Sequence, residues 1–124
     1  MNVKTGTKER FTVITPQDAQ LPVNMTEELR NLLLSYLQKG IPHIVLNMEN
    51  VKAISEEAAE EIASIQQQFY EANSSFVICC LQPEAEKVFA QKEFFDIMNI
   101  TPSESEAWDM VQMEEIEREL LGDN

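Results

Sequence analysis

The sequence is poor in the residues on which most catalytic sites depend. Its 124 residues include one histidine, His43, two cysteines and three glycines. A nucleophile needs a base within reach, and a phosphate-binding loop needs glycines between a strand and a helix. The glycines are Gly6, Gly40 and Gly122, and none falls in such a turn. The sequence therefore argues against an enzyme, and we expect no cofactor.

Positive charge is scarce as well. Nine lysines and arginines stand against 22 aspartates and glutamates, so the formal net charge is −13. Nucleic acids and anionic membrane surfaces bind basic patches, so we expect neither as a partner. No run approaches the ~20 apolar residues of a membrane helix, and the N-terminus lacks the apolar segment of a secretory signal. We expect a cytoplasmic protein without membrane insertion.

The two cysteines are adjacent, at Cys79 and Cys80, in an apolar run that predicts a strand. Successive side chains of a strand point to opposite faces, so a disulfide between the two is poorly placed. We interpret both as small buried apolar residues. A metal site would need carboxylates, and the best cluster is Glu56, Glu57, Glu60 and Glu61. A solvated helix face explains that cluster, so no metal is expected.

Apolar segments of strand type and of helix type alternate along the chain. The hydrophobic fraction of 44% is ordinary for a folded domain. The expected strands cover residues 2–7, 10–16, 44–46, 75–81 and 97–101, with a turn at 7–9. Helices follow the second to fifth strands, which gives the order ββαβαβαβα. Strands joined through a helix are parallel, so we predict a single α/β domain, residues 1–124, with a mixed sheet and a frayed end at 122–124.

Residues 44–72 form the centre of the predicted fold. Residues 44–46 are typical of a buried strand, and residues 47–54 of a loop. Ser55 suits a helix N-cap, and the two glutamates after it place negative charge at the positive end of the helix dipole. Steps of four and three residues indicate the core side of this helix, at Ala58, Ile62, Ile65, Phe69 and Ala72.

The other helices carry their own boundary signals. Asn24 or Thr26 is the expected N-cap of the first helix, and Pro83 suits the first position of the third. Ser103 and Glu106 resemble a capping box that opens the last helix. The core residues expected on these three helices are Leu29, Leu33, Tyr36, Leu37, Ala85, Val88, Phe89, Ala107, Trp108 and Val111.

The segment around Ser55 resembles the central segment of STAS domains, the fold of bacterial anti-sigma factor antagonists. That family has an apolar strand, a polar connection, an apolar residue, and then Asp-Ser-Ser-Gly at a helix start. Ser55, Glu56, Glu57 and Ala58 stand at those four positions. The element order and the segments 82–89, 94–97 and 105–108 also resemble the family, so the resemblance extends over essentially the whole chain.

The resemblance implies a noncatalytic module for regulatory protein–protein interaction. In the antagonists the second serine of the motif is phosphorylated, and this breaks docking on a kinase-type anti-sigma factor. Glu57 stands at that position. We therefore hypothesise that Ser55, Glu56, Glu57 and Ala58 form a partner-binding helix start that is not switched by phosphorylation at residue 57. The alternative is that these residues only begin a helix.

Two further functions stay open at this point. Some STAS proteins are accessory subunits that bind an ABC-transporter ATPase, and an acidic surface is compatible with that partner too. A small-ligand module would hold a lipid or nucleotide between the first helix, the N-terminal hairpin and the final helix. The methionines that would line such a gap are Met25, Met98, Met110 and Met113, although core filling is their commoner role. Self-association is also open.

Overall fold

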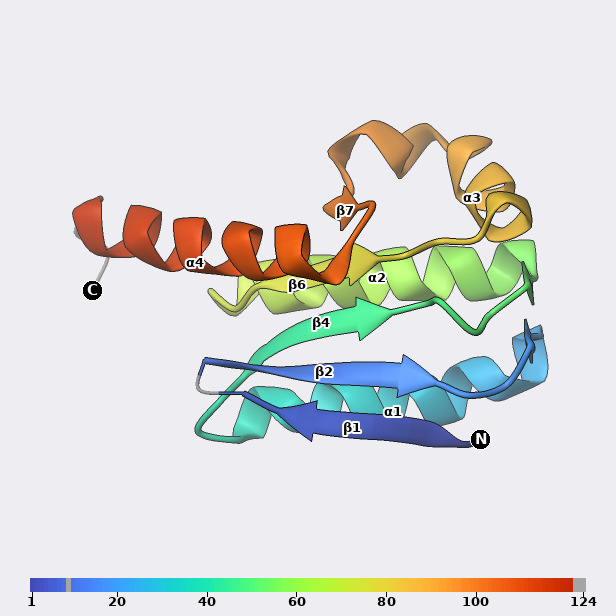
Figure 1. The fold of residues 1–124 in the computed structure, drawn as a ribbon, viewed down its shortest axis with the longest axis horizontal. Coiled ribbons are helices and arrows are strands. Elements are labelled where there is room, and N and C mark those ends of the chain that lie inside the picture. Colours follow the sequence, from blue (N-terminus) through green and yellow to red (C-terminus); the bar gives the residue numbers. More distant parts are fainter. Residues whose placement is uncertain (9, 122–124) are drawn as a thin grey trace.

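The computed structural model describes residues 1–8 and 10–121. In these residues the main sheet is five-stranded (Figure 1), formed by β1 (Val3–Thr7), β2 (Phe11–Pro16), β4 (His43–Asn47), β6 (Phe76–Cys79) and β7 (Ile100–Thr101). The strand order is β1-β2-β4-β6-β7, with β1 antiparallel to β2 and every other neighbouring pair parallel. The predicted mixed sheet is therefore confirmed. Glu9 of the predicted turn and the predicted frayed end at 122–124 lie outside the described residues.

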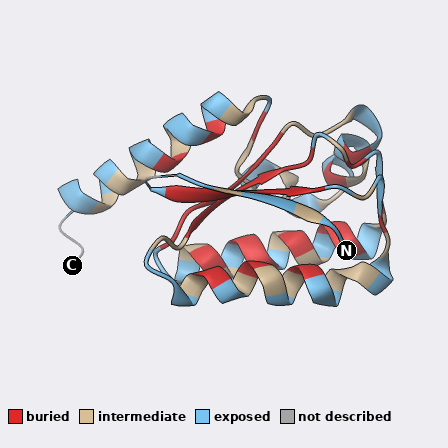
Figure 2. Cartoon of the chain, turned by 60° about the horizontal axis from the view of Figure 1, so that its bottom comes forward, coloured by how far each residue is buried: buried red, intermediate tan, exposed pale blue. Residues whose placement is uncertain are grey.

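Helices pack on both faces of this sheet. They are α1 (Thr26–Ser35), α2 (Glu56–Glu71), α3 (Pro83–Ala90) and α4 (Glu104–Leu120), with short 3-10 turns η1 (Val23–Met25), η2 (Tyr36–Gln38) and η3 (Glu93–Ile97). Figure 2 shows α1 and α2 side by side under the sheet and α4 on the opposite side. The order ββαβαβαβα is confirmed for the main sheet and its helices. Within the described residues, no helix is both long and apolar enough to span a membrane.

Alternation of side chains along the strands divides the core into two layers. In β4, Ile44 and Leu46 face α1 and α2, whereas Val45 faces α4. The layer toward α1 and α2 holds the larger residues, and there Phe69 of α2 meets Phe76 of β6 edge to face at 5.0 Å. The thinner layer under α4 contains Phe11, Val13, Val45, Val77, Cys79, Ala107 and Val111. Most of the apolar burial therefore lies on the side of α2.

A second, two-stranded sheet was not expected from the sequence. β3 (Gln20–Leu21) pairs in parallel with β5 (Ala53–Ile54), in segments predicted to be loops. Strands of two residues are too short to show alternation, so the pattern carried no signal. The pairing joins the connection before α1 to the connection before α2, and Lys52 N–H donates to the carbonyl of Ala19 at 2.7 Å.

The helix caps agree with the sequence at two of three starts. Ser55 caps α2, and the Ser103 hydroxyl accepts from the Glu106 N–H at 3.2 Å to open α4. For α1 the expectation of Asn24 or Thr26 is wrong, because η1 precedes the helix and leaves Met25 at the N-cap position without a side-chain bond. The Thr26 hydroxyl donates instead to the Val23 carbonyl.

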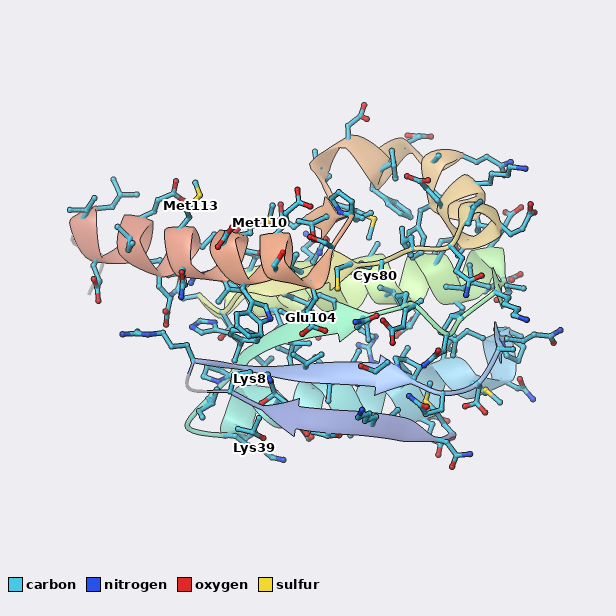
Figure 3. The ribbon with its side chains drawn as sticks, viewed as in Figure 1. Lys8, Lys39, Cys80, Glu104, Met110 and Met113 are labelled. Atoms are coloured by element: carbon cyan, nitrogen blue, oxygen red, sulfur yellow. The ribbon has the colours of Figure 1, made fainter. Side chains whose placement is uncertain are left out.

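Several predicted core positions lie nearer the surface, and Leu37 and Val88 are only partly buried. Ala72 is exposed because α2 ends one residue earlier and Ala72 is its C-cap. Cys80 is only half-buried: it follows the end of β6 with φ of 63°, so it leaves the strand direction (Figure 3). Trp108 packs edge to face on Phe11 at 5.3 Å and stays 36% exposed. Cys79 is fully buried, and both thiols are free in the described chain.

Candidate functional site

The start of α2 lies where the carboxyl ends of β2, β4 and β6 come together. Parallel strands bring the connections that follow them to the same edge of the sheet. Two contacts tie these connections together. The Ser55 N–H donates to the Leu21 carbonyl at 3.1 Å, beside the β3–β5 pairing, and the Gln82 side chain of the β6–α3 connection donates to the Glu49 carbonyl at 2.6 Å. The predicted site is thus held from both sides.

Ser55 and Ala58 both have structural roles at the start of α2. The Ser55 hydroxyl accepts from the Ala58 N–H at 3.0 Å, which is the N-cap bond predicted from the sequence. The Ser55 carbonyl accepts the first helical bond, from Ala59 N–H at 3.0 Å. Ala58 has no exposed surface and packs in the layer under the sheet. Ala58 therefore offers no surface to a partner, and the Ser55 hydroxyl is held in place by the cap bond.

Glu56 and Glu57 are both exposed, but their surroundings differ. Lys92 reaches back from the segment after α3, and its Nζ lies 2.9 Å from a carboxylate oxygen of Glu56 and 2.9 Å from one of Glu60. Hydrogen bonds to Glu60 and Glu56 raise the pKa of Lys92. In the part of the chain that the structure describes, Glu57 makes neither an ion pair nor a side-chain hydrogen bond. Glu57 therefore carries the uncompensated charge of the helix start.

A groove of about 660 Å³ runs along the outer side of α2, between that helix and η3. We call it the α2–η3 groove. Its lining residues are Glu60, Ala63, Ser64, Gln66, Gln67, Tyr70, Phe94, Ile97, Met98, Asn99 and Glu114. Glu60 belongs both to this groove and to the Lys92 ion pairs, so the groove continues from the helix start.

The sequence left open a small-ligand gap between the first helix, the N-terminal hairpin and the final helix. α4 lies on the opposite sheet face from α1, so these two helices do not line one gap. A hollow of about 330 Å³ lies instead between the hairpin and the start of α4, where Lys4, Gly6 and Glu104 are among its lining residues. Of the four methionines, Met98 lines the α2–η3 groove and Met25 packs against the layer of α1 and α2. Met110 and Met113 both belong to α4: Met110 packs against the core layer that this helix covers, whereas Met113 is exposed (Figure 3).

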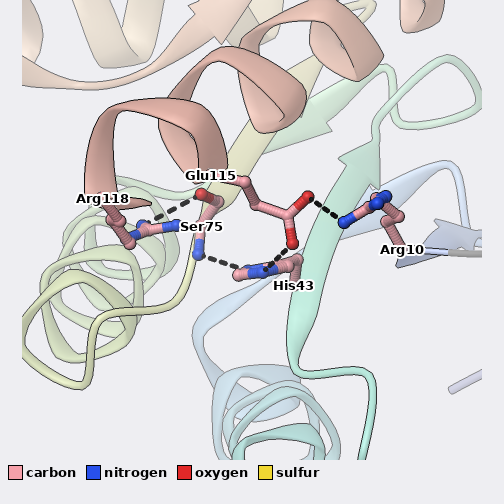
Figure 4. A network of polar contacts seen from close by, with 5 residues as sticks. All are labelled: Arg10, His43, Ser75, Glu115 and Arg118. Carbon is pink, nitrogen blue, oxygen red and sulfur yellow. Dashed lines mark hydrogen bonds and ion pairs between the residues drawn. The ribbon is translucent and has the colours of Figure 1, made fainter. Parts of the chain in front are cut away.

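A polar network fastens α4 to the sheet (Figure 4), and no pattern in the sequence indicated it. Buried His43 accepts at Nδ1 from the Ser75 N–H at 2.9 Å, and its Nε2 lies 3.1 Å from Glu115. Arg10 donates to the other Glu115 oxygen at 3.2 Å, and Arg118 donates to the Ser75 hydroxyl at 3.1 Å. Burial lowers the pKa of His43, against the opposing effect of Glu115. A neutral ring protonated at Nε2 satisfies both contacts.

The geometry of this network indicates a structural role, which is to hold α4 on the sheet. His43 is enclosed by the sheet and α4, and its second nitrogen is used by the backbone. Glu115 lies 72 positions away in sequence, so no local pattern could have paired the two. Among the described residues, no group of three or more histidine, cysteine or carboxylate side chains is arranged to hold a metal ion.

Comparison with known proteins identifies the fold family. Residues 2–107 match the STAS domain family, so the chain belongs to that family, and the predicted resemblance is confirmed. A solved structure of a putative anti-sigma factor antagonist from Thermotoga maritima aligns with a TM-score of 0.79 at 18% identity, covering 89% of this chain and 94% of that one.

Two other solved structures share the fold. The anti-sigma factor antagonist SpoIIAA in its unphosphorylated form aligns with a TM-score of 0.71 at 17% identity, over 90% of this chain and 96% of that one. The Bacillus cell fate determinant SpoIIAA in its phosphorylated form aligns with a TM-score of 0.66 at 16% identity, over 89% of this chain and 99% of that one. At these identities the likeness establishes the fold.

Proposed function

We propose that this chain is a noncatalytic STAS module that binds a regulatory protein partner through the helix start, residues 55–58, and the loop before it. One observation carries the proposal. Ser55 is used as a cap, Ala58 is buried, and Glu56 is paired with Lys92, so among residues 55–58 Glu57 is the one that offers a free charged group. The structural neighbours support a protein partner, because two of them are named as anti-sigma factor antagonists.

The charge of Glu57 bears on how the module would be regulated. Phosphorylation of a serine adds about −1.5 to −2 charges, and the positive end of a helix dipole tolerates such charge. Glu57 supplies one permanent negative charge at the position that the family resemblance assigns to the phosphorylated serine. The module would then resemble a constitutively phosphorylated antagonist, or it would have a different partner. In either case its binding state does not switch through residue 57.

A comparative pull-down tests this proposal. Wild type, Glu57→Ser and Glu57→Ala are used as baits, with Glu71→Ala as a control that removes an equal charge at the far end of α2. The expected result is that the two Glu57 variants retain an anti-sigma kinase that wild type and Glu71→Ala do not. Recovery of one identical partner by all four baits would place the binding surface elsewhere.

The same experiment separates the accessory-subunit alternative. Recovery of a transporter ATPase, unchanged by substitution at Glu57, would favour an accessory role in an ABC-transport system. Recovery of a kinase-type anti-sigma factor would favour partner switching. The acidic surface is compatible with both partners, so the identity of the recovered protein decides between them.

A further inference from the structure

The α2–η3 groove has the size and lining of a binding site. Ligand sites commonly enclose about 300–1,000 Å³ and combine apolar walls with a few fixed polar groups. Here Phe94, Met98 and Ala63 provide apolar wall, and Ile97 at the rim is 83% exposed. The exposed side chain of this isoleucine leaves apolar surface in contact with water. An apolar group bound in the groove would cover that surface.

One end of the groove holds a fixed carboxylate. The Tyr70 hydroxyl donates to Oε1 of Glu114 at 2.7 Å, and the Asn99 side-chain amide donates to Oε2 at 3.3 Å. Asn99 is itself held, because its N–H donates to the side chain of Gln66 at 3.3 Å and its carbonyl accepts from that side chain at 3.2 Å. Gln66 is only 5% exposed. Glu114 is thus positioned by buried or partly buried groups.

Within the described residues, this carboxylate has no cation as a direct partner. Its two donors, Tyr70 and Asn99, are uncharged, and none of the described lysines and arginines forms an ion pair with Glu114. Burial and the contact with Glu114 raise the pKa of Tyr70, so the phenol remains a donor at neutral pH. A negative charge at the end of an apolar groove is complementary to a positive group attached to an apolar body.

We propose that the α2–η3 groove is the docking site for a segment of the protein partner that presents a bulky apolar side chain next to a lysine or arginine. The apolar side chain covers Ile97 and Phe94, and the cation meets Glu114. This inference rests on the proposed function. The groove continues through Glu60 and Lys92 to Glu56, so one partner can cover the helix start and the groove together. A second copy of this chain fits less well, because its net charge is also −13.

Binding of synthetic peptides tests the groove without a known partner. The probe is a fluorescein-labelled hexapeptide with Leu-Phe between two lysines on each side, measured by anisotropy at about 0.15 M salt to screen distant charges. One control peptide carries glutamates in place of the lysines, and the other carries Gly-Ser in place of Leu-Phe. We expect only the Leu-Phe peptide with lysines to bind with measurable affinity. Equal binding by the Gly-Ser peptide would show that charge attraction alone causes the binding, and it would overturn the proposal.

Matched variants of the protein test whether the peptide binds in the α2–η3 groove. Ile97→Ser and Glu114→Gln are each expected to weaken the peptide by about tenfold, as for a central interface residue. Ile116→Ser and Glu119→Gln make the same chemical changes on the exposed part of α4, and we expect less than about a twofold effect from them. Ile97 is exposed, so Ile97→Ser leaves folding intact. Equal losses in both pairs would overturn the proposal.

Two further comparisons test the groove against a small-amine site and against the helix start. If n-octylamine shifts the NMR signals of Ile97 and Asn99 while the peptide does not, the groove takes a small amine and the protein-segment proposal is wrong. If substitution at Glu57 changes the recovered partner, while Ile97→Ser changes neither the recovered partner nor peptide binding, the proposed function is supported and the groove proposal is wrong. If Ile97→Ser abolishes partner recovery and peptide binding, while substitution at Glu57 has no effect, the groove proposal is supported and the helix-start site is wrong.

Discussion

The backbone N–H of Ser75 donates to Nδ1 of His43 across 2.9 Å, so the last residue before β6 fixes the ring of the residue that opens β4. This leaves only Nε2 to carry the proton of the neutral ring. A second proton, on Nδ1, would remove the acceptor that Ser75 uses. The contact therefore explains in local terms why burial in this place favours the neutral imidazole.

Stability should fall as the pH drops below the ordinary pKa of histidine. The pKa of His43 is lowered in the folded state from its usual 6.5. The unfolded chain therefore binds a proton on His43 at a higher pH than the folded chain does, and the free energy of unfolding decreases as pH falls from about 6.5 through the lower folded value. Urea unfolding between about pH 7.5 and 5.5 measures this. His43→Gln should show a smaller decrease; an unchanged pH slope would contradict the assignment.

Loss of the α2 cap should destabilise the fold moderately. Ser55→Ala removes the hydroxyl that accepts from Ala58 N–H, and such losses cost about 1 kcal/mol. Ser55→Asp retains an acceptor and should stay close to wild type. Ser64→Ala, on the exposed face of the same helix, serves as the control and should change the free energy of unfolding by less than about 0.5 kcal/mol. If Ser55→Ala behaved like Ser64→Ala, the cap would contribute nothing.

Two adjacent glutamines should respond very differently to alanine. Gln66 is buried and donates to the Phe76 carbonyl at 2.8 Å and to the Asn99 carbonyl, whereas Gln67 is exposed. Gln66→Ala removes the donor of the Phe76 carbonyl, whereas the Asn99 carbonyl still accepts from the Ile78 N–H at 3.0 Å. The substitution should therefore cost about 1–3 kcal/mol. Gln67→Ala should change stability by less than about 0.5 kcal/mol. Chemical denaturation of the two variants compares them directly, and similar values would show that the Gln66 bonds are dispensable.

Phosphorylation should depend on the residue at position 57. We expect no label on wild type after incubation with the recovered anti-sigma kinase and labelled ATP, because Glu57 offers no hydroxyl and the Ser55 hydroxyl is engaged in the cap. Glu57→Ser should accept label at residue 57, as located by mass spectrometry. Label on Ser55 or on a neighbouring residue of wild type would disprove the absence of switching.

The sequence predicted most of the main sheet because β1, β2, β4, β6 and the helices are long enough to give an apolar run or a repeat. Residues 44–46 and 76–79 are continuous apolar runs, and α2 repeats its apolar residues in steps of four and three. These patterns report which side faces the core, and Ile62, Ile65 and Phe69 are indeed fully buried. The two-residue strands β3 and β5 carry no such period and were missed.

The residues around the groove were harder to predict for another reason. Gln66 follows Ile62 by four positions, so its spacing places it on the core side, whereas glutamine is mostly found exposed. In the structure Gln66 is buried, and its side-chain amide donates to two backbone carbonyls, so a polar residue is accommodated on the core side of the helix. The contacts of Glu114 and Glu115 join segments far apart in the chain, to Tyr70 and His43. Only the topology brings those segments together. The assignment of residues 55–58 as a partner site stays a prediction.

Neighbouring residues of α4 give the groove and the His43 network a shared support. Glu114 reaches Tyr70 at the groove, and Glu115 reaches His43 under the helix. Both contacts require α4 to be seated on the sheet, so occupation of the groove and seating of the helix are thermodynamically coupled. A cation bound at Glu114 would therefore favour the seated helix. Conversely, a substitution that loosens the contact of Glu115 with His43 would also weaken binding in the groove, although that contact lies outside the groove.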